Sequence, residues 1–363
     1  MTLESLFDLT GETAILSVGG LLIGAAFGAF AQASKFCLRS AVIEFSQGLL
    51  GSKVAIWLLA FSAAVTATQA AITFGLLDVT GARQLAARGS LSGSIIGGLM
   101  FGAGMILARG CASRLLVLSA TGNLRALMSG LVLTIVAQTS LRGVLSPARE
   151  TLSELWTVQG GQARNLLSWI DSGPVLGLWL GLLWLACALW LAKRSHIGGV
   201  VGASAVGVGL AVAAGWIFTY AVSQSSFSPV QIKSISFTGP SADTLMGLIN
   251  STSLPLVFDT GLVPGVFLGS MFAALVRGEW KVQGFHDGPS MWRYLIGAPL
   301  MGFGGMLAGG CAVGAGVTGG AIFALTAWMA LAAMWVGALV THLLVDGKVA
   351  AGPALAKPSI PRI

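Results

Sequence analysis

Three of the four cysteines in this chain of 363 residues occupy one repeated position. Segments 96–112 and 296–312 align without a gap, and Cys111 and Cys311 fall on the same place in the two copies. A weaker third copy near the start puts Cys37 at that place, with Gly28 where the first copy has Gly102. The first two copies share the following pairs: Ile96/Ile296, Gly97/Gly297, Gly102/Gly302, Gly104/Gly304, Leu107/Leu307, Ala108/Ala308, Gly110/Gly310, Cys111/Cys311 and Ala112/Ala312.

A repeated cysteine after a glycine-rich apolar segment suggests a thiol held at a break between helices. Burial disfavours the thiolate, so without a nearby cation such a thiol stays a neutral S–H, which is a weak donor that does not repel an anion. Cys37, Cys111 and Cys311 are therefore candidate ligands that pass an anion along by hydrogen bonds. The alternative is that each one is a small apolar side chain packed in a tight turn, and the threefold recurrence favours the first interpretation.

Other cysteine chemistry fits less well. The four cysteines form no C-x-x-C pair, which argues against a thioredoxin-type redox site or a zinc ribbon. Cys187 lies in an uninterrupted apolar segment without a glycine break, and we interpret it as a packing residue. We expect no metal site and no cofactor, although three thiols would suit a soft ion such as Cu(I). No nucleotide-binding loop is present, which excludes ATP hydrolysis by this chain.

The composition indicates what must position these cysteines. The mean hydropathy is +0.86, only 9% of the residues are charged, and there are 51 glycines. These values exclude an ordinary soluble domain and are typical of a multi-pass helical protein whose solvent is the lipid bilayer. The net charge of +7 is dispersed over short loops, so we expect no nucleic-acid partner.

The hydropathy pattern predicts an all-α membrane protein that forms a single integral membrane domain over residues 1–363. We expect short, re-entrant helices after the cysteines, near 38–50, 112–121 and 312–321, because these segments are too short to cross a bilayer. Ser223 to Thr260 is polar and could form a mouth or lid, and the tail 347–363 should be mobile. About nine transmembrane helices are expected, near 13–32, 54–76, 91–108, 124–143, 174–192, 198–220, 261–276, 293–309 and 322–345.

Basic residues between the spans predict the orientation. Lys193 and Arg194, together with the basic tail, place one face in the cytoplasm, with the acidic N-terminus outside and the C-terminus inside. The third and eighth spans then cross in opposite directions, which predicts an inverted-topology repeat with pseudo-symmetric halves of about 13–193 and 198–346. The sixth span repeats the glycine spacing of the first, but no cysteine follows it.

Four basic residues flank the cysteines on the predicted cytoplasmic side: Lys35, Arg39, Arg109 and Arg114. They could attract anions to a vestibule, or they could serve only as orientation signals. Gln69 and His342 within spans are expected either to line the path or to form hydrogen bonds between helices. Glu44 is expected to line a cavity or to pair with Arg39.

The segments Phe36-Cys37-Leu-Arg39, Gly104-Met-Ile-Leu-Ala-Arg-Gly-Cys111 and Gly304-Gly-Met-Leu-Ala-Gly-Gly-Cys-Ala-Val-Gly314 resemble the YeeE/YedE family of bacterial sulfur-compound permeases. The resemblance extends over about residues 13–346. It implies a compact helical bundle in the bacterial plasma (inner) membrane that imports thiosulfate, with Cys37, Cys111 and Cys311 as ligands. It also implies that a small TusA-like sulfur-carrier protein, if one takes part, is a separate partner at the cytoplasmic face.

Two other function classes remain open at this stage. A membrane sulfurtransferase or thiol redox enzyme would form a persulfide or disulfide at one of these thiols. It would need an activated thiolate or a resolving partner, and no base is evident near the cysteines. A transporter of another sulfur or selenium oxyanion would use the same residues as a thiosulfate permease. We therefore expect a permease and not an enzyme.

Overall fold

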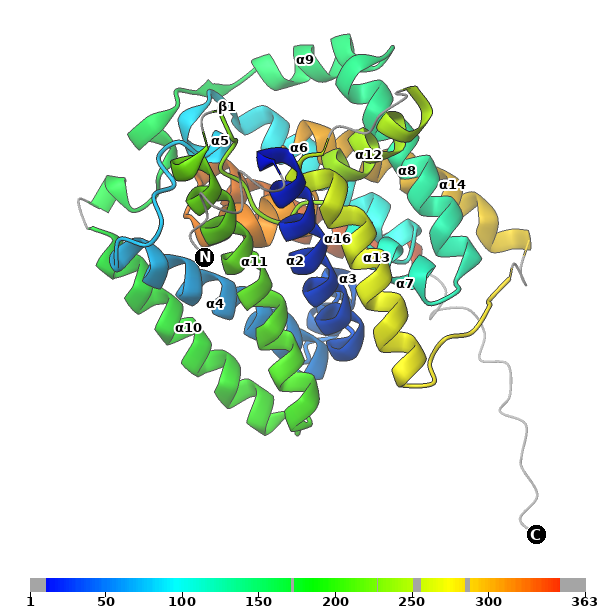
Figure 1. The fold of residues 1–363 in the computed structure, drawn as a ribbon. Coiled ribbons are helices and arrows are strands. Elements are labelled where there is room, and N and C mark those ends of the chain that lie inside the picture. The colour runs from blue at the N-terminus through cyan, green and yellow to red at the C-terminus, as the bar shows by residue number, and fades with distance from the viewer. Residues whose placement is uncertain (1–10, 171–172, 227, 251–255, 285–287, 347–363) are drawn as a thin grey trace.

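The computed structural model describes residues 11–170, 173–226, 228–250, 256–284 and 288–346. These residues form a bundle of helices with one small two-stranded sheet (Figure 1). The tail 347–363, which we expect to be mobile, lies outside the described residues.

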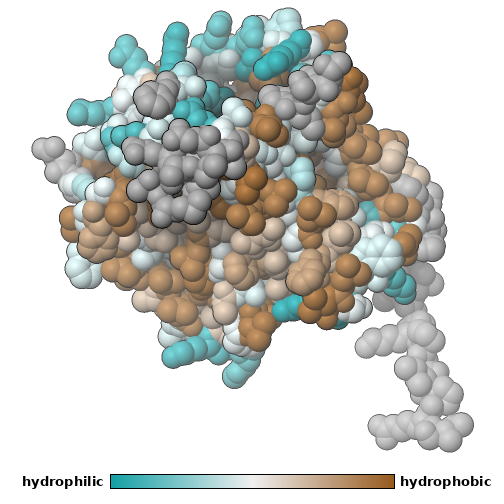
Figure 2. All heavy atoms as spheres, in the orientation of Figure 1, coloured by the Kyte–Doolittle hydropathy of each residue, from teal (hydrophilic) through white to brown (hydrophobic). Residues whose placement is uncertain are grey.

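Nine helices in the described residues are long and apolar enough to cross a membrane, and they coincide with the nine predicted spans. Figure 2 shows apolar residues across the middle of the visible face and hydrophilic residues gathered at its upper and lower edges. The chain is therefore an all-α membrane protein, as predicted. The spanning helices are α2 (Glu12–Ser34), α4 (Ser52–Thr73), α6 (Leu91–Leu107), α8 (Leu124–Arg142), α10 (Pro174–Arg194), α11 (Gly199–Ser225), α13 (Phe258–Val276), α14 (Gly288–Leu307) and α16 (Leu325–Val345).

Short helices follow three of these spans, and each begins directly after a cysteine, as predicted. They are α3 (Leu38–Ser46), α7 (Ala112–Ala120) and η3 (Ala312–Thr318), the last wound as a π-helix and continued by α15 (Gly319–Ala321). A fourth short helix, α12 (Thr238–Asn250), stands between α11 and α13. The order of long helix, junction, short helix and long helix thus occurs four times, and α10 lies outside this pattern.

The remaining elements connect the spans. Arg164 ties two of these connections together, because it donates hydrogen bonds to the Ala87 carbonyl at 2.6 Å and to the Thr326 hydroxyl. Burial, together with the neighbouring charge of Arg83, lowers the pKa of Arg164 to about 10, so it remains a cation at neutral pH. The connecting elements are α5 (Arg83–Ala86), β1 (Gly89–Ser90), α9 (Ser146–Glu154), β2 (Thr157–Val158), η1 (Gly161–Arg164) and η2 (Ser168–Ile170).

The polar stretch after α11 does not form the mouth or lid that we expected. Within it, Ser234, Ile235, Phe237 and Thr238 are buried. Hydrogen bonds hold the segment in place, since the Ser234 hydroxyl donates to the Val212 carbonyl at 2.6 Å. The prediction is therefore wrong for residues 234–238, which run through the interior of the bundle.

Helices α2 and α13 run parallel and touch through glycines on both sides. A Cβ at Gly24 would collide with the Leu262 carbonyl oxygen, and one at Gly28 would collide with the Val266 carbonyl oxygen. Glycines on α13 lie in the same way against the backbone of α2. Small residues of this kind let membrane helices approach closely, where van der Waals contact replaces the hydrophobic driving force. The glycines of this contact are Gly20, Gly24 and Gly28 on α2, and Gly261, Gly265 and Gly269 on α13.

Helices α6 and α14, which contain the two matching sequence copies, pack antiparallel with reciprocal contacts. A Cβ at Gly97 would lie 2.5 Å from the Gly304 carbonyl oxygen, and one at Gly297 would lie 2.7 Å from the Gly104 carbonyl oxygen. Each contact therefore has a counterpart in which the two copies exchange roles. Such reciprocity is the relation that a two-fold axis between the copies produces.

We predict that Gly24→Ala lowers the thermal unfolding midpoint of the detergent-solubilised protein. The added Cβ overpacks the backbone contact with α13, which costs about 1–3 kcal/mol. Gly130→Ala on α8 is the matched control, because a Cβ there meets nothing within 4 Å and alanine favours a helix by about 1 kcal/mol. Equal midpoints for the two variants would contradict the close packing of α2 on α13.

Candidate functional site

The three cysteine junctions share one backbone turn. Two residues before each cysteine, the chain adopts the left-handed conformation that ends many helices. Non-glycine residues rarely adopt it, so its recurrence marks a common local structure. The φ values are 55° at Lys35, 56° at Arg109 and 82° at Gly309.

The hydrogen bonds at the junctions also recur. In each copy the amide directly before the cysteine donates back to the carbonyl five residues earlier, as in a Schellman motif. The pairs are Phe36 to Ala31 at 3.2 Å, Gly110 to Met105 at 3.1 Å and Gly310 to Gly305 at 2.8 Å. This motif satisfies carbonyl groups at the helix end that would otherwise be unpaired away from water.

Each cysteine then begins the next helix as its N-cap residue. All three thiols are free and buried, with exposed fractions of 7% for Cys37, 2% for Cys111 and 1% for Cys311. The Cys311 sulfur accepts the Gly314 amide proton at 3.4 Å. The Cys111 sulfur lies 3.2 Å from the Ser113 hydroxyl oxygen. The sequence thus places each thiol at the break between a long and a short helix.

The structure brings these thiols close together. Cys37 and Cys311 both lie near enough to Cys111 to interact with it electrostatically. Cys187 is separate, because it is exposed on the outer face of α10. We interpreted Cys187 as a packing residue; its thiol instead faces the surroundings of the bundle, away from the other three.

The basic residues that flank the cysteines differ in their surroundings. Lys35 is exposed and forms an ion pair with Glu279 at 3.5 Å. Arg109 is exposed, whereas Arg39 and Arg114 are half-buried. Within the described residues, the Arg39 Nε and Arg114 Nη1 atoms are buried without a hydrogen-bond partner. These two guanidinium groups therefore have donors available for an anion.

Arg293 is a further basic residue at this end. It lies in electrostatic range of Arg39, as do Arg109 and Asp346. Arg293 donates a hydrogen bond to the Asp346 carboxylate at 2.9 Å, and the other oxygen of that carboxylate lies 3.0 Å from the His342 Nδ1 atom. Burial alone would raise the pKa of Asp346, but its hydrogen bonds with Arg293 and His342 outweigh that effect and lower it. His342 thus contacts a carboxylate at the end of its own helix and does not bond to a neighbouring helix through this contact.

A cavity of about 290 Å³ lies beside Arg39. Glu44 lines it, as one of our two alternatives predicted, but its carboxylate accepts the amide protons of Lys53 and Val54, each at 2.8 Å. Glu44 therefore caps the start of α4. The cavity is lined by Arg39, Ser40, Ile43, Glu44, Gln47, Leu49 and Lys53.

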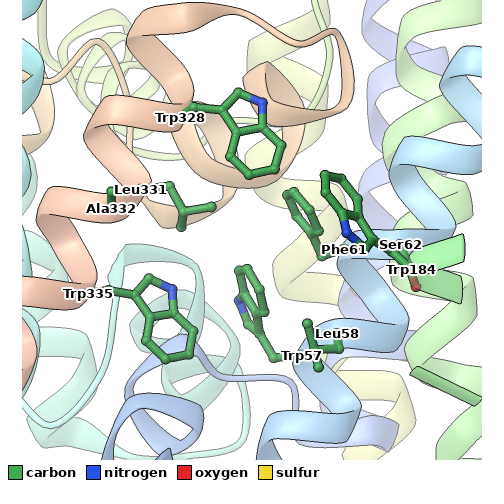
Figure 3. A pocket seen from close by; sticks show the side chains of 9 residues that line it. All are labelled: Trp57, Leu58, Phe61, Ser62, Trp184, Trp328, Leu331, Ala332 and Trp335. Atoms are coloured by element: carbon green, nitrogen blue, oxygen red, sulfur yellow. The ribbon is translucent and has the colours of Figure 1, made fainter. Parts of the chain in front are cut away.

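A second cavity, of about 310 Å³, lies between α4, α10 and α16 and is apolar (Figure 3). Its tryptophans come from distant parts of the chain, which is why the sequence did not reveal it. It contains no cysteine and no charged group, so its chemistry does not suit an anion. Nearby, Gln69 donates to the Ala321 carbonyl at 2.7 Å, which is the interhelical bond that we gave as one alternative. The cavity is lined by Trp57, Leu58, Phe61, Ser62, Trp184, Trp328, Leu331, Ala332 and Trp335.

Comparison with known proteins identifies the family. The profile of the family described as sulphur transport matches residues 33–340, a range that includes all three cysteine junctions. The chain belongs to the sulphur transport family. This result confirms the resemblance to the YeeE/YedE permeases found in the sequence.

Two relatives match this chain over most of their length. The thiosulfate transporter TsuA of Spirochaeta thermophila is 31% identical over 86% of this chain and 93% of its own length. The thiosulfate transporter TsuA of Escherichia coli is 26% identical over 90% of this chain and 94% of its own length. Both relatives are named as transporters, which agrees with our expectation that this protein is not an enzyme.

We predict that Gly309→Ala lowers the thermal midpoint in detergent more than Gly309→Asn does. A Cβ at Gly309 meets nothing within 4 Å, so only the left-handed backbone opposes alanine, at a cost of about 1–2 kcal/mol. Asparagine tolerates this conformation better than alanine. If both variants unfold at the parent temperature, the left-handed turn before Cys311 is not present.

Proposed function

We propose that this protein is a permease for thiosulfate in the bacterial plasma membrane, and that Cys37, Cys111 and Cys311 are its successive ligands. The observation that supports it best is the burial of three free thiols, two of them in electrostatic range of the third, at junctions with a common local structure. The names of the two relatives support thiosulfate as the substrate.

The chemistry of the thiols suits weak binding and release of an anion better than tight binding. A neutral S–H is a weak donor, so each thiol binds the anion only weakly and can release it to the next one. A fixed cation in the interior would cost about 2.5–3.5 kcal/mol on insertion scales and would hold a dianion more tightly. Conduction requires sites that are favourable enough to enter and weak enough to leave.

The basic residues give the path a direction. Lys35, Arg39, Arg109 and Arg114, together with Arg293, form the cytoplasmic vestibule of the proposed path, where they attract the anion as it leaves the last thiol. On this proposal the N-terminus lies outside and the C-terminus in the cytoplasm. Cys37 and Cys111 then enter the bundle from the cytoplasmic side and Cys311 enters from the outside.

The reciprocal contacts of α6 and α14 support an inverted-topology repeat behind this arrangement. In transporters with such repeats, the substrate site lies at the repeat interface near the middle of the membrane. A separate TusA-like sulfur carrier would receive the substrate or its sulfur at the vestibule.

A transporter of another sulfur or selenium oxyanion is the second candidate, because neutral thiols and guanidinium groups recognise these anions as well. A membrane sulfurtransferase is less well supported, since it would require an activated thiolate. The described residues contain no group of three or more His, Cys, Asp or Glu side chains that could hold a metal ion.

Uptake of radiolabelled thiosulfate into proteoliposomes tests the proposal. We expect Cys37→Ser, Cys111→Ser and Cys311→Ser each to reduce uptake at least tenfold, because each removes one step of the path. Cys187→Ser is the matched control and should transport like the parent, since Cys187 is exposed on α10. Sulfate should compete poorly with thiosulfate uptake. Competition by selenite and sulfite tests the second candidate, a transporter of another sulfur or selenium oxyanion.

Two results would count against the proposed function. Absence of uptake by the parent protein would exclude thiosulfate as its substrate. Parent-like uptake by all four cysteine variants would exclude the thiol path and leave the cysteines as packing residues. Size-exclusion profiles of every variant show whether a loss of uptake reflects misfolding.

A further inference from the structure

The fourth junction of the bundle carries no cysteine. Residues 228–237, between α11 and α12, form no helix or strand, and Phe237 stands directly before the short helix, where the other three junctions have a thiol. The Phe237 ring packs on Phe27 of α2, with ring centroids 5.3 Å apart. A hydroxyl residue flanks Phe237 on each side, namely Ser236 and Thr238.

The segment is held firmly against the cysteine junction that follows α14. Thr318 of η3 donates to the Ile235 carbonyl at 2.6 Å, and Trp216 of α11 donates to the Thr318 carbonyl at 3.4 Å. The Thr219 hydroxyl donates to the Lys233 carbonyl at 2.6 Å. The position of Ser236 is therefore fixed relative to η3.

Ser236 and Cys311 approach the same residue of η3. A side chain at Gly314 would collide with the Ser236 hydroxyl, and the Gly314 amide donates to the Cys311 sulfur. Glycine at position 314 thus leaves room for the Ser236 hydroxyl at a residue whose amide also contacts the Cys311 thiol. This contact joins two junctions that are far apart in the sequence.

Ser236 is partly accessible, as a residue that lines a substrate path would be. Among residues 234–238 it alone is half-buried, while its four neighbours are buried. Its hydroxyl forms no hydrogen bond with the described residues. By contrast, the Ser234 hydroxyl in the same segment is bonded to the Val212 carbonyl.

Thr238 provides a second, independent observation. Its exposed fraction is 0%, yet its hydroxyl has no partner among the described residues. It lies against Gly305 of α14, where a Cβ would be 3.0 Å from the Thr238 oxygen. Buried hydroxyls are usually paired, and leaving one unpaired is costly. An unpaired donor at this place has the property expected of a group that binds a ligand.

We propose that Ser236, supported by Thr238, is a binding residue that donates its hydroxyl to an oxygen atom of the transported anion beside Cys311. This inference rests on the proposed function and adds to it. Thiosulfate has a sulfur end and an oxygen end. A hydroxyl is a stronger donor than a thiol, so the fourth junction recognises the oxygen end while the thiol contacts the sulfur.

Uptake kinetics of Ser236→Ala test the inference. We expect KM for thiosulfate to rise roughly tenfold, as for the loss of one hydrogen bond to a charged group, with little change in Vmax. Ser236→Cys keeps a weaker donor, so its KM should lie between those of the parent and Ser236→Ala. The matched control is Ser204→Ala, because the Ser204 hydroxyl on α11 is satisfied by its own helix at 2.7 Å from the Val200 carbonyl.

The outcomes separate this inference from the proposed function. Uptake by the parent with an unchanged KM for Ser236→Ala overturns the role of Ser236 and leaves the permease intact. A lower Vmax with an unchanged KM in both Ser236 variants would also overturn it, since that pattern indicates a structural role. If Ser236→Ala does not fold, a parent-like KM in Ser236→Cys has the same meaning. Absence of uptake by the parent overturns both proposals.

Discussion

The contact on which the rest of the structure depends is the close crossing of α6 and α14, in which backbone touches backbone. Any side chain at Gly97, Gly104, Gly297 or Gly304 would occupy the space of the opposite helix. In a bilayer this proximity stabilises the pair by van der Waals contact, since lipid gives helices little hydrophobic reason to associate. Because the crossing is antiparallel, it delivers Cys111 and Cys311 into the interior from opposite ends. The parallel glycine contact of α2 with α13 then positions the helix that leads to Cys37.

Much of this fold could be predicted because its signals are local. A run of apolar residues defines each span, and the structure has a long helix at every predicted one. The cysteine junctions were predictable because a left-handed turn followed by a helix start requires a short, repeated pattern of residues. The alignment of Cys111 with Cys311 therefore located two sites, and the spacing from Gly28 located a third at Cys37.

The parts that could not be predicted depend on contacts between distant segments. Residues 234–238 are rich in serine and threonine, which suggests a surface loop, but α11 and η3 pair with the Ser234 hydroxyl and the Ile235 carbonyl, so this part of the segment can be buried. Trp57, Trp184 and Trp328 meet only after folding and show no common spacing. Glu44 lines a cavity, as one of its two alternatives predicted, but the sequence did not show that its carboxylate accepts two amide protons at the start of α4. None of these outcomes has a signal within a single segment.

The distribution of charge argues for a division of labour along the proposed path. Arginine donors without partners occur beside the cysteine junctions, at Arg39 and Arg114, while the junctions themselves offer buried free thiols. A guanidinium group at every step would bind a dianion strongly at each one, and release would then limit the rate. Neutral donors in the interior keep successive sites similar in free energy, and a cation at the end adds an attraction only where the anion leaves. Asp346 fits this division, because it neutralises Arg293 while Arg39 and Arg114 retain free donors.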